Sequence, residues 1–275
     1  MDRFICVTCG TQFQDSEAPP AECPICTDPR QYVPPEGQQW TTLTELATDH
    51  HNDIRAEGDL VGIGTEPSFA IGQRALLVPF GDSNLLWDCI TLLDDASAEE
   101  VEHRGGLAAI AISHPHYYSG MVEWAHRFSC PIYLHGADAD WVMRPDPAIE
   151  HWDGDLNELG WGLTLVRGGG HFPGGTMLHR AEGAGVLLTG DIIQVIPDRT
   201  HVGFMWSYPN LIPLPETAVQ GIAAAVEPFA FDVIYGAWWG RVIPSGAKEI
   251  VRRSAERYGA ALRGEVEARA PAGSA

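Results

Sequence analysis

The residues of this chain that are best suited to chemistry are three histidines and an aspartate. His114 and His116 stand one residue apart, directly after the apolar run 107–112, so a strand that ends there can aim both imidazoles at one ion. His171 follows a glycine run, and Asp191 follows a second apolar run. Three neutral nitrogens and one carboxylate suit a borderline metal such as zinc or ferrous iron. The sequence therefore predicts a mononuclear metal site.

Four of the six cysteines form two Cys-x-x-Cys pairs near the N-terminus, Cys6 with Cys9 and Cys23 with Cys26. In such a pair the two thiolates curl around one ion, and four thiolates give a closed tetrahedral site for zinc or iron. A segment this short buries little core, so the bound metal is expected to supply most of its folding free energy. The spacing predicts a second, structural metal site.

This cysteine pattern resembles a rubredoxin or zinc-ribbon module that covers about residues 3–36. Rubredoxins carry a glycine after each pair, which Gly10 matches, whereas Thr27 stands after the second pair. The departure favours zinc over iron and a structural role over a redox role. The run Pro-Pro-Glu-Gly at 34–37 is typical of a linker. We therefore expect a module at 1–36 and a main domain at 37–275.

Length and charge limit the classes of function. The chain has 275 residues, enough for one large domain with a small appendage, and its formal net charge is −20. That charge argues against nucleic acid and against an anionic membrane surface as partners. No run approaches the roughly 20 apolar residues of a membrane span, and the first residues lack the order of a secretory signal. We expect a cytoplasmic protein with a small-molecule substrate, and the sequence leaves homo-oligomerisation open.

The order of apolar runs and turn signals predicts sheets covered by helices. Ser97 and the residues after it read as a capping box that starts a short helix. The polar stretch around His50 and His51 precedes the expected strands and is interpreted as a solvated loop or helix. Other expected strands are 74–79, 84–89, 106–112, 131–134, 162–166, 176–178, 185–189 and 232–235, and expected helices are 119–128, 137–143, 215–226 and 247–263. This pattern favours an α/β or α+β sandwich.

Four of these features, in this order, resemble the metallo-β-lactamase superfamily. They are the strand that ends in Asp88, the His114-Pro115-His116 turn followed by a helix, the Gly-His171 loop and the Thr-Gly-Asp191 segment. The resemblance covers about residues 60–260. It implies an αββα sandwich whose active site lies at one edge of two facing sheets.

The chain departs from this superfamily at the ligands of the second metal. The family signature His-x-His-x-Asp-His keeps its first two histidines, but Tyr118 replaces the aspartate and Ser119 replaces the third histidine. A late histidine of the family is also missing, because the matching region contains Trp238 and Trp239. The resemblance therefore implies a one-metal variant whose ion is held by the three retained histidines and Asp191.

Such a site is expected to be a hydrolase in which a metal-bound water, with a pKa near ~7, attacks an ester, lactone, thioester or amide carbonyl. Asp191 would complete the coordination or accept the proton of the water, and Tyr118 would donate a hydrogen bond to the oxyanion. Four further residues are candidates for substrate contacts, three as an aromatic wall and the last for a carboxylate: Trp206, Tyr208, Trp239 and Arg241.

Two alternatives stay open. His114, His171 and Asp191 alone make the two-histidine, one-carboxylate set that suits ferrous iron and oxygen. The chain would then be a mononuclear non-haem iron oxidoreductase, similar to persulfide dioxygenases of the superfamily and served by the rubredoxin-like module. The other alternative is a metal-binding scaffold without catalysis.

Overall fold

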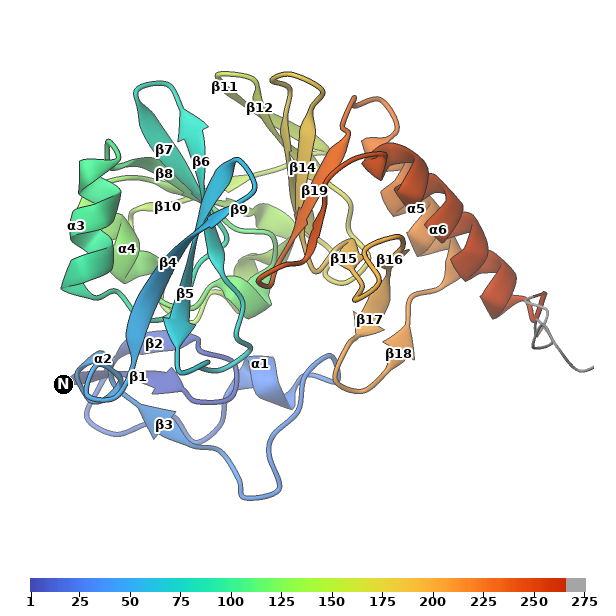
Figure 1. Cartoon of the computed structure of the whole chain (residues 1–275). Coiled ribbons are helices and arrows are strands. Elements are labelled where there is room, and N and C mark those ends of the chain that lie inside the picture. Colours follow the sequence, from blue (N-terminus) through green and yellow to red (C-terminus); the bar gives the residue numbers. More distant parts are fainter. Residues whose placement is uncertain (266–275) are drawn as a thin grey trace, which may run out of the picture.

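The main body of the protein is built from two sheets that face each other (Figure 1). The structure is a computed structural model, and it describes residues 1–265. The first sheet has seven strands in the order β10-β9-β8-β7-β6-β5-β4, and the second has six in the order β11-β12-β13-β14-β19-β20. The bounds of the first set are β4 (His51–Glu57), β5 (Leu60–Glu66), β6 (Ala75–Phe80), β7 (Ser83–Trp87), β8 (Leu107–Ala111), β9 (Ile132–His135) and β10 (Ile149–Trp152). Those of the second are β11 (Leu156–Gly160), β12 (Leu163–Arg167), β13 (Thr176–Arg180), β14 (Val186–Gly190), β19 (Val233–Gly236) and β20 (Val242–Ile243).

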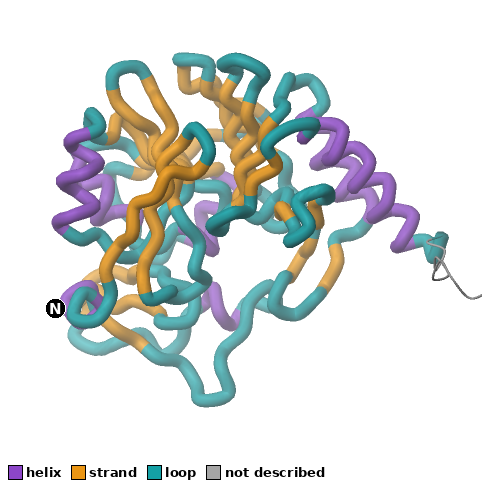
Figure 2. Tube along the Cα trace, viewed as in Figure 1, coloured by secondary structure: helices purple, strands orange, loops and turns teal. Residues whose placement is uncertain are grey.

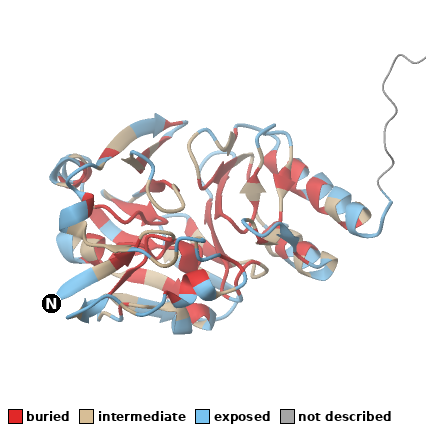
Figure 3. Cartoon of the chain, turned by 90° about the horizontal axis from the view of Figure 1, so that it is seen from below, coloured by how far each residue is buried: buried red, intermediate tan, exposed pale blue. Residues whose placement is uncertain are grey.

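Helices cover the outer face of each sheet (Figures 1 and 2). The helices α3 (Asp95–His103) and α4 (Met121–Phe128) pack on the first sheet, and α5 (Glu216–Val226) and α6 (Ala247–Leu262) pack on the second. Their outward sides are largely exposed, as Figure 3 shows for the pair α5 and α6. The predicted αββα sandwich is confirmed. Among the described residues, no helix has both the length and the apolar character needed to cross a membrane.

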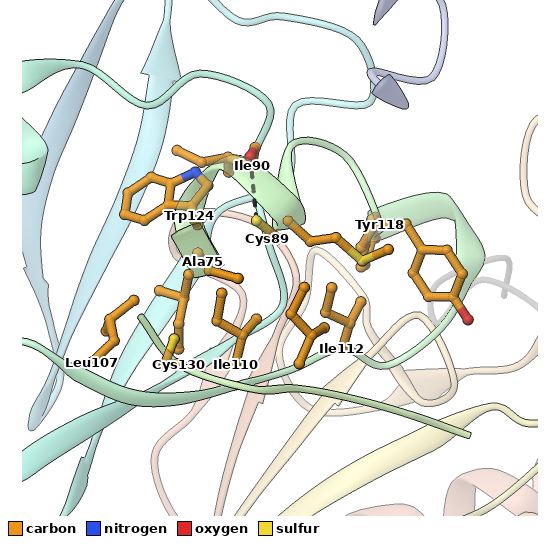
Figure 4. Packing of buried hydrophobic residues seen from close by; sticks show 14 of the residues in the cluster. Ala75, Cys89, Ile90, Leu107, Ile110, Ile112, Tyr118, Trp124 and Cys130 are labelled. Carbon is orange, nitrogen blue, oxygen red and sulfur yellow. Dashed lines mark hydrogen bonds between the residues drawn. The ribbon is translucent and has the colours of Figure 1, made fainter. Parts of the chain in front are cut away.

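Central strands of the sandwich, such as β6, are apolar on both sides because both of their faces are buried. In β6, Leu76 and Val78 face the layer between the two sheets, whereas Ala75 and Leu77 face the helices α3 and α4. Successive side chains of a strand point to opposite faces, so each strand contributes to two cores. Figure 4 shows the core beneath α4, in which the two lone thiols, Cys89 and Cys130, pack as small apolar groups.

The N-terminal segment forms a small layer of its own at one end of both sheets (Figure 1). It contains β1 (Asp2–Cys6), β2 (Gln12–Ser16), β3 (Trp40–Thr41) and the short helices α1 (Pro24–Thr27) and α2 (Leu43–Leu46). Its sheet has the order β2-β1-β3, so it continues beyond residue 36 as far as Thr41. We call residues 1–41 the cysteine module. Of the predicted main domain 37–275, the last residues, 266–275, lie outside the described part.

Two local predictions were wrong. The stretch that begins at His51 is not a loop or helix but β4, an edge strand of the first sheet. Its polar residues suit an edge, where one side of the strand remains in contact with solvent, and they conceal the strand pattern. The helix α3 begins before Ser97, because the side chain of Asp94 accepts a hydrogen bond from the Ser97 backbone N–H and caps the helix there.

Candidate metal centre

Three separate segments deliver the histidines and the aspartate to one end of the sandwich. After β8 the chain stays extended through His114 and then turns into a single 3₁₀ turn, Pro115–Tyr117, which presents His116. Asp191 follows the last residue of β14, and His171 lies in the connection between β12 and β13. β8 and β14 belong to different sheets, so the site bridges the two halves of the sandwich at the end that faces the cysteine module.

The four side chains converge. One ligand atom from each of His114, His116, His171 and Asp191 lies within 4.8 Å of the others. The Nε2 atom of His171 is 3.2 Å from Nδ1 of His116, and Nε2 of His114 is 3.9 Å from Oδ2 of Asp191. All four residues are buried, the most exposed being Asp191 at 4%. The structure thus brings together the whole predicted ligand set.

The protonation of these groups fits a bound cation. Burial and the neighbouring imidazoles lower the pKa of His114 well below its ordinary value, and burial lowers the pKa of His171 to about 4, so both rings are neutral at pH ~7. Burial raises the pKa of Asp191 to about 7, so its carboxylate needs a positive partner. Nε2 of His114 and Oδ1 of Asp191 are buried without a hydrogen-bond partner in the described residues. A divalent ion would satisfy both atoms.

Hydrogen bonds from the surroundings fix the orientation of the ligands. Nδ1 of His171 lies 3.2 Å from the carbonyl oxygen of Met205, which can only accept, so this nitrogen carries the proton and Nε2 keeps its lone pair. Nδ1 of His114 lies 2.9 Å from the Ser113 hydroxyl. The hydroxyl of Tyr208 donates to the carbonyl oxygen of Asp191 over 2.7 Å. Such outer contacts hold a ligand in the geometry that a metal requires.

The four cysteines of the module form the second group able to hold a metal. Their sulfur atoms lie within 4.8 Å of one another, with Cys6 Sγ 3.5 Å from Cys26 Sγ and Cys9 Sγ 3.6 Å from Cys23 Sγ. All are buried and none is in a disulfide. The side chain of Gln38 donates a hydrogen bond to Cys6 Sγ over 3.0 Å, as a thiolate ligand favours. The predicted four-cysteine module is confirmed as a group that fits a metal.

The cysteine module packs directly against the histidine site. Nη1 of Arg30 donates to the carbonyl oxygen of His171 over 3.3 Å, and its guanidinium lies 3.7 Å from the ring centre of Phe172. The amide of Asn210 donates to the carbonyl oxygens of Pro29 and Gln31, each over 2.9 Å. These contacts join the module to the two loops that carry His171 and Tyr208.

A cavity of about 260 Å³ lies between the module and the sandwich, next to the metal ligands. Among residues 1–265, the lining contains no lysine or arginine and consists of Thr8, Gln31, Tyr32, Ala70, Ile71, His116, His171, Asp191, Tyr208, Pro209 and Trp238. Thr8 stands between the cysteines of the first pair, so the module forms part of the wall of the cavity. The metal ligands therefore face a small, largely uncharged space.

The predicted substrate residues are divided between two places. Tyr208 lines the cavity. Trp239 and Arg241 instead line a neighbouring hollow of about 560 Å³, which shares Trp238 with the cavity. Trp206 is not among the residues that line either space, and its ring centre lies 5.8 Å from the guanidinium carbon of Arg30. Substrate contact by any of these four residues stays a prediction.

Tyr118, the predicted oxyanion donor, is 2% exposed and packs in the core beneath α4 (Figure 4). It is not among the residues that line the cavity, and its catalytic role stays a prediction. Its neighbour Tyr117 packs against His114, with ring centres 4.4 Å apart. Sequence reasoning missed Thr8, Gln31 and Tyr32, the three module residues that line the cavity. The cysteine spacing does not indicate which part of the sandwich the module packs against.

Comparison with known proteins identifies the class. No family model matches the chain. Solved structures that resemble it include VMB-1 at pH 5.5 (TM-score 0.58, 13% identity, 77% of this chain and 98% of that one) and the mono-zinc form of the metallo-β-lactamase FIM-1 from Pseudomonas aeruginosa (0.54, 16%, 76% and 96%). A peroxy diiron species of the chemotaxis sensor ODP is also similar (0.53, 14%, 77% and 94%). The chain is thus a metallo-β-lactamase-fold protein with an N-terminal four-cysteine module.

A relative with much higher identity defines the family more narrowly. The uncharacterized protein YmaE of Bacillus subtilis (strain 168) is 48% identical over 272 residues, which are 97% of this chain and 99% of YmaE. The chain belongs to the same family as YmaE. The match includes nearly the whole length of both proteins, so the similarity is not confined to one of the two parts of the chain.

Proposed function

We propose that the protein is a metal-dependent hydrolase that uses one ion, held by His114, His116, His171 and Asp191, to cleave a carbonyl bond of a small molecule. The observation that carries this proposal is the convergence of three neutral imidazoles and one buried carboxylate at the wall of a cavity. When bound, a zinc or ferrous ion polarises a carbonyl and lowers the pKa of a coordinated water. Esters, lactones, thioesters and amides are the substrates that this chemistry suits.

The residues of the chain have distinct parts in this proposal. The imidazole of His171 presents a lone pair because its other ring nitrogen donates to the carbonyl oxygen of Met205. Nδ1 of His114 is engaged by the Ser113 hydroxyl, so Nε2 is the nitrogen that faces Asp191. Asp191 supplies the negative charge of the site and is the group placed to accept a proton there. Its backbone is held by Tyr208, so the carboxylate keeps its position next to His114.

The residues at the lost ligand positions support a single ion. The hydroxyl of Ser119 accepts a hydrogen bond from the side chain of Gln73 over 3.0 Å, and Tyr118 is packed in the core. Trp238 donates from Nε1 to the carbonyl oxygen of Ile71 over 3.2 Å. These side chains are occupied with structural contacts, and neither an indole nor a packed phenol is a usual ligand for zinc.

Metal content and activity of one variant test the proposal. The wild-type chain is expected to bind one ion at each of its two metal groups and to hydrolyse members of a panel of small esters, lactones, thioesters and amides. His116→Ala should lose one ion per chain and the activity. The control is His151→Ala, which changes an exposed histidine of β10. A His116→Ala protein that keeps both ions, or its full activity, would contradict the proposal.

A second candidate is an iron-dependent oxidoreductase. It is favoured by the position of Thr8, which lies between two cysteines of the module and also lines the cavity, because iron in the cysteine site would then lie close to the histidine site. Metal analysis after aerobic and anaerobic purification separates the candidates. Coloured protein with iron in both sites supports the oxidoreductase, whereas colourless protein with zinc supports the hydrolase.

A further inference from the structure

Gln31 of the cysteine module lines the cavity, and its side chain has an unused hydrogen-bonding group. Its residue is 7% exposed and lines the cavity together with His116, His171 and Asp191. The side-chain oxygen, Oε1, is buried and has no hydrogen-bond partner in the described part of the chain. A buried acceptor without a partner costs free energy, so a molecule in the cavity that donates a hydrogen bond to it would be bound more tightly.

The backbone around Gln31 is firmly placed. The carbonyl oxygen of Gln31 accepts from Nδ2 of Asn210 over 2.9 Å, and that of Arg30 accepts from the Ser207 hydroxyl over 3.0 Å. The side chain of Arg30 packs on Phe172, next to His171. The module therefore holds Gln31 in a fixed position relative to the metal ligands, which is what a substrate-binding group requires.

The rest of the cavity indicates the kind of molecule that Gln31 would bind. Apart from the metal ligands, the lining offers hydroxyl groups, the amide of Gln31 and apolar surface such as Ile71 and Trp238. Within the described part of the chain, it offers no lysine or arginine for an anionic group. The volume of about 260 Å³ is at or below the lower end of usual ligand pockets. These features suit a small uncharged molecule that carries a hydroxyl or an amide N–H.

We propose that Gln31 is a specificity residue of the histidine site: its Oε1 accepts a hydrogen bond from a hydroxyl or amide N–H of a small uncharged carbonyl substrate. The proposal deepens the hydrolase function and rests on it for the nature of the substrate. It also gives the cysteine module a part in substrate selection, because Gln31 belongs to the module whereas the metal ligands belong to the sandwich.

The test compares matched ester pairs that differ only by a hydroxyl: methyl lactate with methyl propionate, and methyl 3-hydroxybutyrate with methyl butyrate. In at least one of the two pairs, wild-type protein loaded with zinc should have a kcat/KM for the hydroxy ester about tenfold higher than for the matched ester without the hydroxyl. One hydrogen bond provides a difference of this size. Gln31→Met keeps the length of the side chain and should abolish that preference through KM, with metal content and kcat little changed. Gln14→Met, on the exposed side of β2 in the same module, should behave like wild type.

Calorimetric titration with the same four esters separates the two proposals. If wild-type protein hydrolyses none of them but binds a hydroxy ester more tightly than its partner, and Gln31→Met loses the difference, the hydrolase proposal fails for these esters and the role of Gln31 stands. A wild-type protein that does not discriminate within either pair, in hydrolysis or in binding, overturns the role of Gln31. A preference that persists in Gln31→Met overturns it as well.

Discussion

Arg30 of the cysteine module donates a hydrogen bond to the backbone carbonyl of His171, a ligand of the histidine site, over 3.3 Å. The same guanidinium lies over Phe172 and pairs with Asp28 over 2.7 Å. One buried side chain of the module therefore contacts the loop that carries a ligand of the histidine site. The module forms part of the wall of the site, so substitutions in the module should alter the cavity.

Arg30→Ala should loosen this connection. The variant loses the stacking on Phe172 and the hydrogen bond to His171, which together are expected to cost about 1–3 kcal/mol. The midpoint of thermal unfolding should fall, and residues 1–41 should become more sensitive to protease. Arg252→Ala, which removes two exposed ion pairs on α6, is the control and should change stability by less than about 1 kcal/mol. Equal effects of the two variants would contradict the docking role of Arg30.

Loss of the module metal should impair substrate binding more than chemistry. Cys9→Ser removes one of the four thiolates, so the module metal is expected to be lost and the wall formed by Thr8 and Gln31 to become disordered. Metal analysis should find one ion left per chain, at the histidine site. KM should rise at least about fivefold, an expectation scaled to the loss of one hydrogen bond. Unchanged KM in a protein that has lost the module metal would separate the module from substrate binding.

Tyr208→Phe tests the support of Asp191. The variant keeps the ring but removes the hydroxyl that donates to the Asp191 carbonyl oxygen. Because this hydrogen bond holds the backbone of Asp191 and not its carboxylate, metal binding should weaken by about tenfold, the lower end of the range for contacts that support metal ligands. Competition with a chelator measures the effect. Tyr133→Phe, in β9 and away from the cavity, should bind metal like wild type.

The stability of the interface between the module and α4 should depend on pH through Glu123. Burial raises the pKa of this carboxyl, but the guanidinium groups of Arg144 and Arg3 outweigh burial, and the net pKa is below the ordinary 4.5. A depressed pKa in the folded state gives stability that is present above pH 4.5 and is lost as the pH falls through the folded value.

Glu123→Gln lacks this contribution at every pH. The difference in free energy of unfolding between wild type and Glu123→Gln should therefore be constant near pH ~7 and shrink below pH 4.5. Denaturant titrations at several pH values provide the measurement, and Glu99→Gln, at an exposed position of α3, is the control. A difference that grows on acidification would contradict the assignment.

The sequence was sufficient for the sandwich and for both ligand sets. Strand and helix patterns identified most of the core because buried strands such as β6 are continuously apolar. The metal ligands could be identified because they stand between or directly after predicted elements, where side chains from different segments can meet. The edge strand β4 was missed because its polar residues do not follow the pattern. The position of Gln31 depends on how the module packs, and packing between two domains leaves no periodic signal in the chain.

Anomalous X-ray scattering from a crystal of the metal-loaded protein, recorded on both sides of the zinc and iron absorption edges, tests the central claim most directly. The account predicts one ion among His114, His116, His171 and Asp191 and one among the four cysteines, with Gln31 at the cavity between them. Two ions at the histidine site, or none with the four side chains apart, would contradict it.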